Sequence, residues 1–146
     1  MIIITAEGIE KTIQRFSSAP RKLTELMRKG MEASLEVLHQ SVPPYPSAPQ
    51  GSAYSRTGTL GRSLGSGFGG GASGGKPTVY SITGSGQNVT GTFGTNLSYA
   101  QYVIDPESQA YMHKGRWWTM KNISNSAYKK IIEVWDNIVR GWSRTI

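Results

Sequence analysis

The sequence predicts an α+β fold in which a long N-terminal helix and a C-terminal helix accompany a small antiparallel sheet. Three observations lead to this prediction. Apolar residues recur at helical spacing in residues 20–41 and again in 122–142, and two β-rich segments lie between them. The 146 residues fit a single domain, 1–146. We expect two insertions in it, a proline-rich loop at 43–56 and a glycine-rich mobile loop at 65–77.

Composition limits the classes of function. Sixteen Lys and Arg against nine Asp and Glu give a formal charge of +7, which favours acidic partners such as nucleic acid, anionic lipid or an acidic protein surface. Cysteine is absent, which excludes a disulfide framework and a cysteine metal site and suits assembly in a reducing cytoplasm. No apolar run approaches the roughly 20 residues that span a bilayer, so no membrane partner is expected.

The N-terminal elements follow from short patterns. The β-branched run Ile2 to Thr5 predicts an edge strand. Residues 7–17 predict a short amphipathic helix, with Ile9, Ile13 and Phe16 on one face. A new helix is then expected to begin near Pro20, which suits a first turn because its missing N–H would be unpaired there.

The helix predicted over 20–41 carries a continuous apolar stripe that ends before two prolines. Ser34 falls on this stripe and is small enough to lie there. The stripe consists of Leu23, Met27, Met31, Leu35, Leu38 and Val42. Since Pro43 and Pro44 cannot continue a helix, the chain should turn extended at this point.

Two loops and a short helical turn follow. After the proline-rich residues, Thr57 or Thr59 is expected to cap a turn that points Leu60 and Leu64 inward and Arg62 outward. The glycine-rich residues predict mobility, because glycine loses much entropy on ordering. Phe68 in this loop is either an anchor onto the domain or a contact with another subunit.

A hairpin and a hinge occupy the centre of the chain. Residues 78–83 and 88–93 predict two strands joined by a Gly-Ser-Gly-Gln loop. Residues 94–106 then place Tyr99, Tyr102 and Val103 at helical spacing, so we expect a short helical turn that presses a tyrosine face onto the core. Asp105 should end it, because a residue before proline avoids helical geometry.

The C-terminal part combines a basic aromatic segment, residues 107–120, with a closing helix. Asn122 or Ser124 is expected to cap a helix that runs to about Trp142. Its apolar face is wide, which predicts that the helix is sandwiched between the sheet and another surface.

Catalytic and metal chemistry find little support in the sequence. The chain has only two histidines, with no H-x-x-x-H pair, so a zinc site is not expected. His113, Asp105 and a serine could imitate a hydrolase triad, but no nucleophile-elbow context accompanies them. Neither glycine-rich stretch leads into G-K-[ST], so nucleotide binding is not expected. We predict no catalytic, cofactor-binding or metal-ligating residue.

The most informative cluster of side chains is Lys114-Gly115-Arg116-Trp117-Trp118. Cations interleaved with aromatic rings bind single-stranded nucleic acid by charge and stacking. Tryptophan and arginine are also enriched at the energetic centres of protein interfaces. A third interpretation is that one tryptophan fills the core and the cations are solvated. Adjacent residues in extended chain face opposite ways, so one ring can pack inward while the other serves a partner.

A set of short motifs resembles a known family. The order Thr57-Gly58-x-Leu60-x-x-Ser63, a β pair, Gly94-Thr95-Asn96 and Tyr99-Ala100-x-Tyr102-Val103 is similar to the small neck and tail-completion proteins of long-tailed bacteriophages. The resemblance covers roughly residues 20–142. The chain departs from the family at Arg56, where an acidic residue is usual, and at Ile104-Asp105-Pro106, where Glu-x-Gly is usual.

The resemblance implies a twisted sheet packed on helices, no catalysis and no cofactor. It also implies a ring of copies, commonly six, between the head connector and the tail tube, assembled in the host cytoplasm and retained in the virion. The partners would be neighbouring connector, terminator or tail tube proteins, with DNA passing through the lumen. We expect these subunit or partner contacts at Arg56, Arg62, Phe68, Tyr99, Tyr102, Lys114, Arg116, Trp117 and Trp118.

The leading hypothesis is therefore a virion structural protein that completes the tail or joins head to tail. A tail terminator or another minor tail protein is an alternative within the same class. The second hypothesis is a DNA-binding module that uses the basic aromatic segment, and the third is a hydrolase built around His113 and Asp105.

Overall fold

The computed structural model describes residues 1–6, 20–48, 50–51 and 57–145. The predicted helix over 7–17 lies outside these residues. The elements in chain order are β1 (Ile2–Thr5), α2 (Pro20–Gln40), α3 (Thr59–Ser63), β2 (Val79–Thr83), β3 (Thr90–Gly94), α4 (Ala100–Ile104), a 3-10 turn (Tyr111–His113) and α5 (Met120–Thr145). The α+β class is confirmed.

The sheet is antiparallel, with strand order β1-β3-β2, so β1 is an edge strand as predicted. Its central strand places Phe93 opposite Ile2 on one side and opposite Tyr80 on the other. Phe93 is fully buried. The loop of the β2–β3 hairpin contains Gly84 with a φ of 94°, a left-handed conformation that side chains other than glycine rarely adopt. The predicted hairpin is confirmed.

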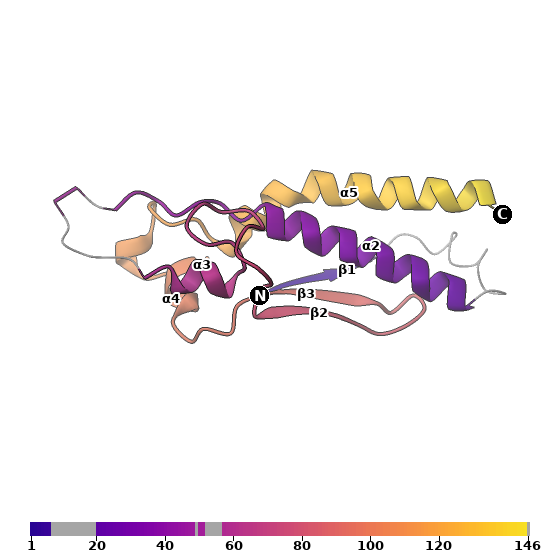
Figure 1. The fold of residues 1–146 in the computed structure, drawn as a ribbon, viewed down its shortest axis with the longest axis horizontal. Helices are drawn as coiled ribbons and strands as arrows, with labels where there is room; N and C mark the ends of the chain where they lie inside the picture. The colour runs from indigo at the N-terminus through magenta and orange to yellow at the C-terminus, as the bar shows by residue number, and fades with distance from the viewer. Residues whose placement is uncertain (7–19, 49, 52–56, 146) are drawn as a thin grey trace.

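Helix α2 lies between the sheet and α5, which runs beside it in the opposite direction (Figure 1). The predicted stripe is buried along its whole length. On the sheet side the backbones approach closely, because a Cβ at Gly91 of β3 would meet the Met31 side chain at 2.7 Å. On the α5 side, the Ser34 hydroxyl donates to the Gly30 carbonyl at 2.7 Å and accepts from Trp135 Nε1 at 2.9 Å. The polar residue of the stripe is therefore satisfied.

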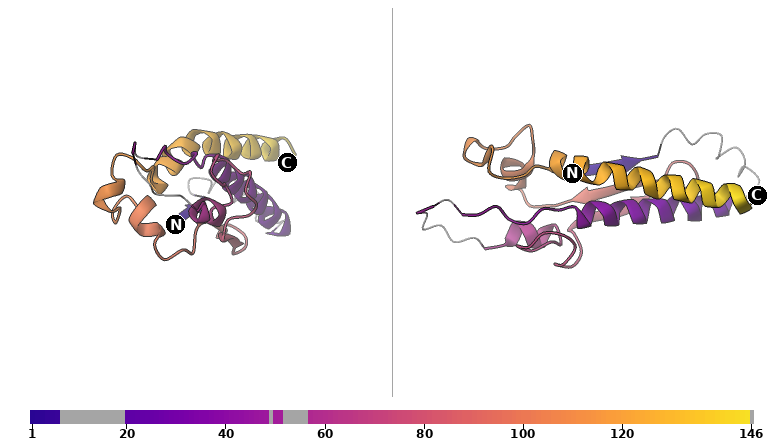
Figure 2. Two further views of the ribbon diagram at one scale, coloured as in Figure 1. Left: turned by 60° about the vertical axis from the view of Figure 1, so that its left-hand side comes forward. Right: turned by 90° about the horizontal axis from the view of Figure 1, so that it is seen from above.

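Helix α5 differs from its prediction at its start and in its packing. It begins at Met120, and Asn122 lies inside the first turn, where its Oδ1 accepts the backbone N–H of Thr119 at 2.7 Å. The helix packs mainly on α2, and the described chain does not sandwich it. Figure 2 shows α5 as the outer layer along α2. The wide apolar stripe misled the prediction because periodicity shows how much of a helix is apolar, not which element covers it.

Helix α3 follows its prediction in orientation and departs from it in capping. Leu60 and Leu64 are buried and Arg62 is exposed. The residue before the helix is Gly58, with a φ of 73°, and the Thr57 hydroxyl accepts the N–H of Thr59, the first helical residue, at 3.5 Å. Thr57 Oγ1 also lies 2.9 Å from Thr59 Oγ1. Thr57 therefore accepts the first N–H of the helix, as predicted for a threonine cap, but from the position before the left-handed glycine that turns the chain into the helix.

Helix α4 does not press the predicted tyrosines onto the core, although Val103 of the predicted face is half-buried and packs against it. Tyr99 and Tyr102 are 43% and 54% exposed, whereas Ala100 and Ile104 are buried. The five-residue helix offers two candidate faces. The core takes the aliphatic face, because a buried phenol hydroxyl would need a hydrogen-bond partner inside. Asp105 ends the helix in an extended conformation, as predicted.

The glycine-rich segment folds back as a series of turns on the C-terminal end of α2. Gly71 donates its N–H to the Val42 carbonyl at 2.8 Å, and Gly74 donates to the Gly65 carbonyl at 2.9 Å. The His39 ring nitrogen Nε2 lies 2.8 Å from the Gly65 oxygen. The mobility predicted for this loop stays a prediction. None of the described helices combines the length and apolarity needed to cross a membrane.

The contact between α2 and α5 predicts opposite effects for two glycine-to-alanine changes. A Cβ at Gly30 would lie 2.5 Å from the Trp135 ring, whereas a Cβ at Gly141 would meet nothing within 4 Å. Gly30→Ala should lower the free energy of unfolding by about 2 kcal/mol through overpacking. Gly141→Ala should raise it by up to about 1 kcal/mol through helix propensity. Urea unfolding measures both, and stabilisation by Gly30→Ala would contradict the packing.

Candidate interaction surface

Four segments that are far apart in the sequence meet at the end of the molecule opposite the C-terminus (Figure 1). Tyr45 joins them. Its ring lies edge-on to Phe68 of the glycine-rich loop and to Trp117 of the basic aromatic segment, with centroid distances of 4.8 Å and 5.0 Å. Its hydroxyl accepts the N–H of Gly61 in α3 at 2.7 Å, and its own N–H donates to the Phe68 carbonyl at 2.9 Å. We call Tyr45, Phe68, Trp117 and Trp118 the aromatic cluster.

Both tryptophans of the aromatic cluster have partners within the chain. Trp117 is half-buried and lies between Tyr45 and His113, whose ring is edge-on at 6.4 Å. Trp118, also half-buried, donates its indole N–H to the Pro44 carbonyl at 3.1 Å. The two indoles lie 5.8 Å apart between centroids. Stacking of a nucleobase needs an accessible ring face, so this packing favours structural roles for both rings.

The exposed part of the basic aromatic segment is its tip. Tyr111 is 92% exposed, and Met112 is also exposed. Lys114 and Arg116 follow on the surface, and Gly115 between them turns with a φ of 75°. No periodicity in the sequence could reveal the exposure of Tyr111 and Met112, because these residues form a single 3-10 turn. The tip combines apolar and cationic side chains, as protein interfaces do.

The remaining candidate residues lie around this end of the molecule. Arg62 is exposed and donates from its guanidinium to Thr59 Oγ1 at 3.4 Å. Phe68 packs on Tyr45, as the anchoring interpretation predicts, and it is also 50% exposed, so its contact with another subunit stays a prediction. Tyr99 and Tyr102 are exposed on α4. Arg56 lies outside the described residues.

Two of the motifs meet in a hydrogen-bonded junction. Thr95 Oγ1 donates to Ser63 Oγ at 2.7 Å, and Ser63 Oγ donates in turn to the Leu60 carbonyl at 2.7 Å. Thr78 adds a second link, since its hydroxyl donates to the Ser63 carbonyl at 3.1 Å and accepts from the Asn96 N–H at 3.0 Å. The junction therefore joins α3 to the start of β2 and the end of β3.

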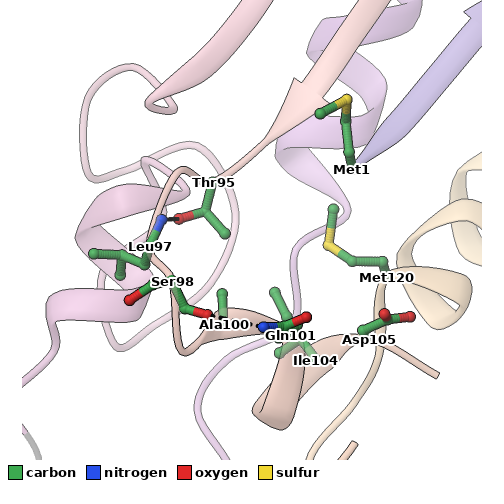
Figure 3. A pocket seen from close by; sticks show the side chains of 9 residues that line it. All are labelled: Met1, Thr95, Leu97, Ser98, Ala100, Gln101, Ile104, Asp105 and Met120. Atoms are coloured by element: carbon green, nitrogen blue, oxygen red, sulfur yellow. Dashed lines mark hydrogen bonds between the residues drawn. The ribbon is translucent and has the colours of Figure 1, made fainter. Parts of the chain in front are cut away.

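A pocket of about 450 Å³ opens beside this junction (Figure 3). Its apolar wall comes from Met1, α4 and the start of α5, and Asp105 stands at its edge. The lining residues are Met1, Thr95, Leu97, Ser98, Ala100, Gln101, Ile104, Asp105 and Met120. Asp105 Oδ1 accepts the backbone N–H of Glu107 at 3.2 Å, while His113 lies against Trp117 and does not line the pocket. This arrangement does not assemble the hydrolase triad.

A shallow groove of about 750 Å³ runs between α2 and β2. Glu32 and Glu36 of α2 line it together with Tyr80 of β2. Partial burial, and then the negative charges of Glu36 and Glu32, raise the pKa of the Tyr80 phenol above its usual value. The described residues contain no group of three or more His, Asp or Glu placed to hold a metal ion.

No protein-family model, curated protein or solved structure matches the chain. The function proposed for this surface therefore depends on the residues themselves and on the motifs that they form.

The aromatic cluster predicts that the Tyr45 hydroxyl contributes to stability. Tyr45→Phe removes the acceptor of the Gly61 N–H and should lower the free energy of unfolding by about 1 to 2 kcal/mol. Tyr111→Phe makes the same chemical change at a residue that is 92% exposed and should have no measurable effect. Thermal unfolding followed by tryptophan fluorescence distinguishes them, and equal effects of the two changes would contradict the role of Tyr45.

Proposed function

We propose that the chain is a structural protein of a tailed-phage virion that completes the tail or joins head to tail. The observation that carries the proposal is the motif order Thr-Gly-x-Leu-x-x-Ser, Gly-Thr-Asn and Tyr-Ala-x-Tyr-Val. Two of its motifs meet in the bond between Ser63 and Thr95. The third, which forms α4, follows directly after this junction. The bond holds α3 against the end of β3, which fits motifs that serve a shared fold rather than a reaction.

The surface chemistry supports a role in assembly. Several large apolar side chains are exposed at the end that carries α3 and α4, notably Phe68, Tyr99, Tyr102, Tyr111 and Met112. Exposed apolar groups beside cations are typical of surfaces that a partner covers. We propose that these residues contact neighbouring copies in a ring, commonly of six, and the adjoining connector, terminator or tail tube proteins.

The net charge suits this location. A formal charge of +7 favours a neighbouring acidic ring or the DNA that passes through the lumen of such a ring. Assembly would take place in the host cytoplasm, and the mature protein would remain in the neck or tail of the virion. A tail terminator or another minor tail protein would present the same chemistry at a different level of the tail.

The DNA-binding alternative makes a different claim about the basic aromatic segment. It requires Trp117 to stack on bases, whereas this ring packs between Tyr45 and His113. If the alternative were correct, Trp117→Ala and Arg116→Ala would both weaken salt-dependent DNA binding, and only the arginine change would reduce the salt slope.

The proposal predicts the phenotype of a phage that lacks this chain. A null allele should yield DNA-filled heads separate from tails, or tails with abnormal ends, because the joining ring would be missing. Expression of the intact chain in the host should restore joined particles. Electron microscopy of lysates measures the fraction of joined particles.

A change at the exposed tip provides a matched comparison for this phenotype. Tyr111→Ser with Met112→Ser removes exposed apolar groups without touching the buried core and should reduce rescue by the expressed chain. Glu25→Gln on the exposed surface of α2 should rescue fully. Normal joined particles from the null allele would contradict the proposed function.

A further inference from the structure

The apolar surface of α5 extends beyond the part that α2 covers. Ile123 and Ala127 are fully buried against α2. One position further round the helix, Tyr128 is 66% exposed and Ile132 is 44% exposed. Trp135 and Val139 continue this second row and are half-buried. The Trp135 ring also lies over Gly30 and donates to Ser34 of α2, so α2 covers part of this ring and only its exposed part belongs to the second row. We call Tyr128, Ile132, Trp135 and Val139 the outer stripe.

The outer stripe has the spacing of a helix–helix seam. Its members are separated by four, three and four residues, which is the alternation that keeps one row of side chains facing a partner helix in a coiled coil. The row extends over about 17 Å of helix. A helix is therefore the partner whose surface this row fits.

Charged residues at one edge of the outer stripe are complementary to each other. Lys129 and Asp136 are seven residues apart, so they occupy the same position of the repeat, on the edge directly beside the outer stripe, and both are exposed. In an antiparallel pair of identical helices, residues of this edge face the same edge of the partner. Lys129 of each copy then faces Asp136 of the other, while Ile132 packs on Trp135 and Tyr128 packs on Val139.

A parallel pair would not match these charges. There the edge of Lys129 and Asp136 would face the opposite edge of the partner helix, which carries Ile131 and Ile138. Both isoleucines are half-buried and belong to the apolar face that packs on the core. Three further charged residues of this part of α5 are exposed. Glu133 and Arg140 follow Ile132 and Val139 and lie on the same side of the helix as Lys129 and Asp136 but further from the seam, whereas Lys130 lies on the opposite face.

We propose that the free chain forms a two-fold symmetric dimer in which the outer stripes of two α5 helices pack antiparallel. The shape of the molecule permits this contact. Helices α3 and α4 lie at one end, and α5 extends away from them to the C-terminus (Figure 1). An antiparallel pair therefore places the α3–α4 ends at opposite ends of the dimer, where they do not collide.

The dimer is independent of the virion role proposed above. A ring in which every copy points the same way uses a different contact, because a two-fold contact is closed by two copies. The dimer is thus the state of the free protein, and incorporation into a ring opens it. Its failure would leave the location of the chain in the virion unaffected, and the reverse also holds.

The proposal can be tested by reversing charges in the full chain and measuring the dimer dissociation constant. Sedimentation equilibrium measures this constant at chain concentrations up to about 100 μM. The wild-type chain should dimerise, and Lys129→Glu should weaken the dimer roughly tenfold, because both reciprocal pairs become repulsive. Lys129→Glu with Asp136→Lys should restore the dimer, since each pair is re-formed with its signs exchanged. Lys130→Glu makes the same charge change on the same helix outside the seam and should leave the dimer unchanged.

A distance measurement tests the orientation. The chain has no cysteine, so Lys121→Cys accepts a single spin label at an exposed position on α5. An antiparallel dimer centred between Ile132 and Trp135 should place the two labels roughly 37 Å apart, whereas a parallel dimer would place them within about 15 Å.

Four results would overturn the proposal. These are a monomer at every concentration, a dimer that neither Lys129→Glu nor Ile132→Ser weakens, a double reversal that fails to restore the dimer, and a short distance between the labels. Circular dichroism of each variant verifies that α5 is intact, so that a loss of dimer reports on the seam.

Discussion

The structure depends on the burial of α2 on two sides. On one side Met31 packs over Gly91 of β3, and on the other Trp135 of α5 lies over Gly30 and donates to Ser34. Glycine and serine at these positions let the backbones approach, and the long methionine and leucine side chains fill the space on the sheet side. Without α2, the sheet and α5 would have no common core, because neither packs extensively on the other.

The parts of the fold that the sequence predicted correctly are those whose signals are local. The stripe from Leu23 to Val42 repeats every turn, and the hairpin has turn glycines between two β-rich runs. The predictions that were wrong concern which element of the fold each apolar face packs against. The wide stripe of α5 could not indicate that α2, rather than the sheet, covers it. The spacing of Tyr99 and Tyr102 could not show that the core would take Ala100 and Ile104 instead.

The sequence indicates which aromatic residues belong to the candidate site, but not which residues they contact. Trp117 and Trp118 stand out in the sequence, yet Tyr45, which joins them to the glycine-rich loop, lies in a proline-rich segment without periodicity. Its bond to Gly61 spans 16 residues, and the bond of Trp118 to Pro44 spans 74. Contacts of this kind come from the tertiary fold, so spacing in the sequence carries no signal of them. The aromatic cluster thus fixes two loops, and the exposed tip remains for a partner.

The central claim is that this surface acts by assembly with other proteins and not by chemistry within the chain. A reconstruction of the virion by cryo-electron microscopy tests it most directly. The account predicts a ring of density for this chain at the neck or the head-proximal end of the tail, with Tyr111 and Met112 covered by a neighbouring subunit. Mature particles that contain no copy of the chain would contradict it.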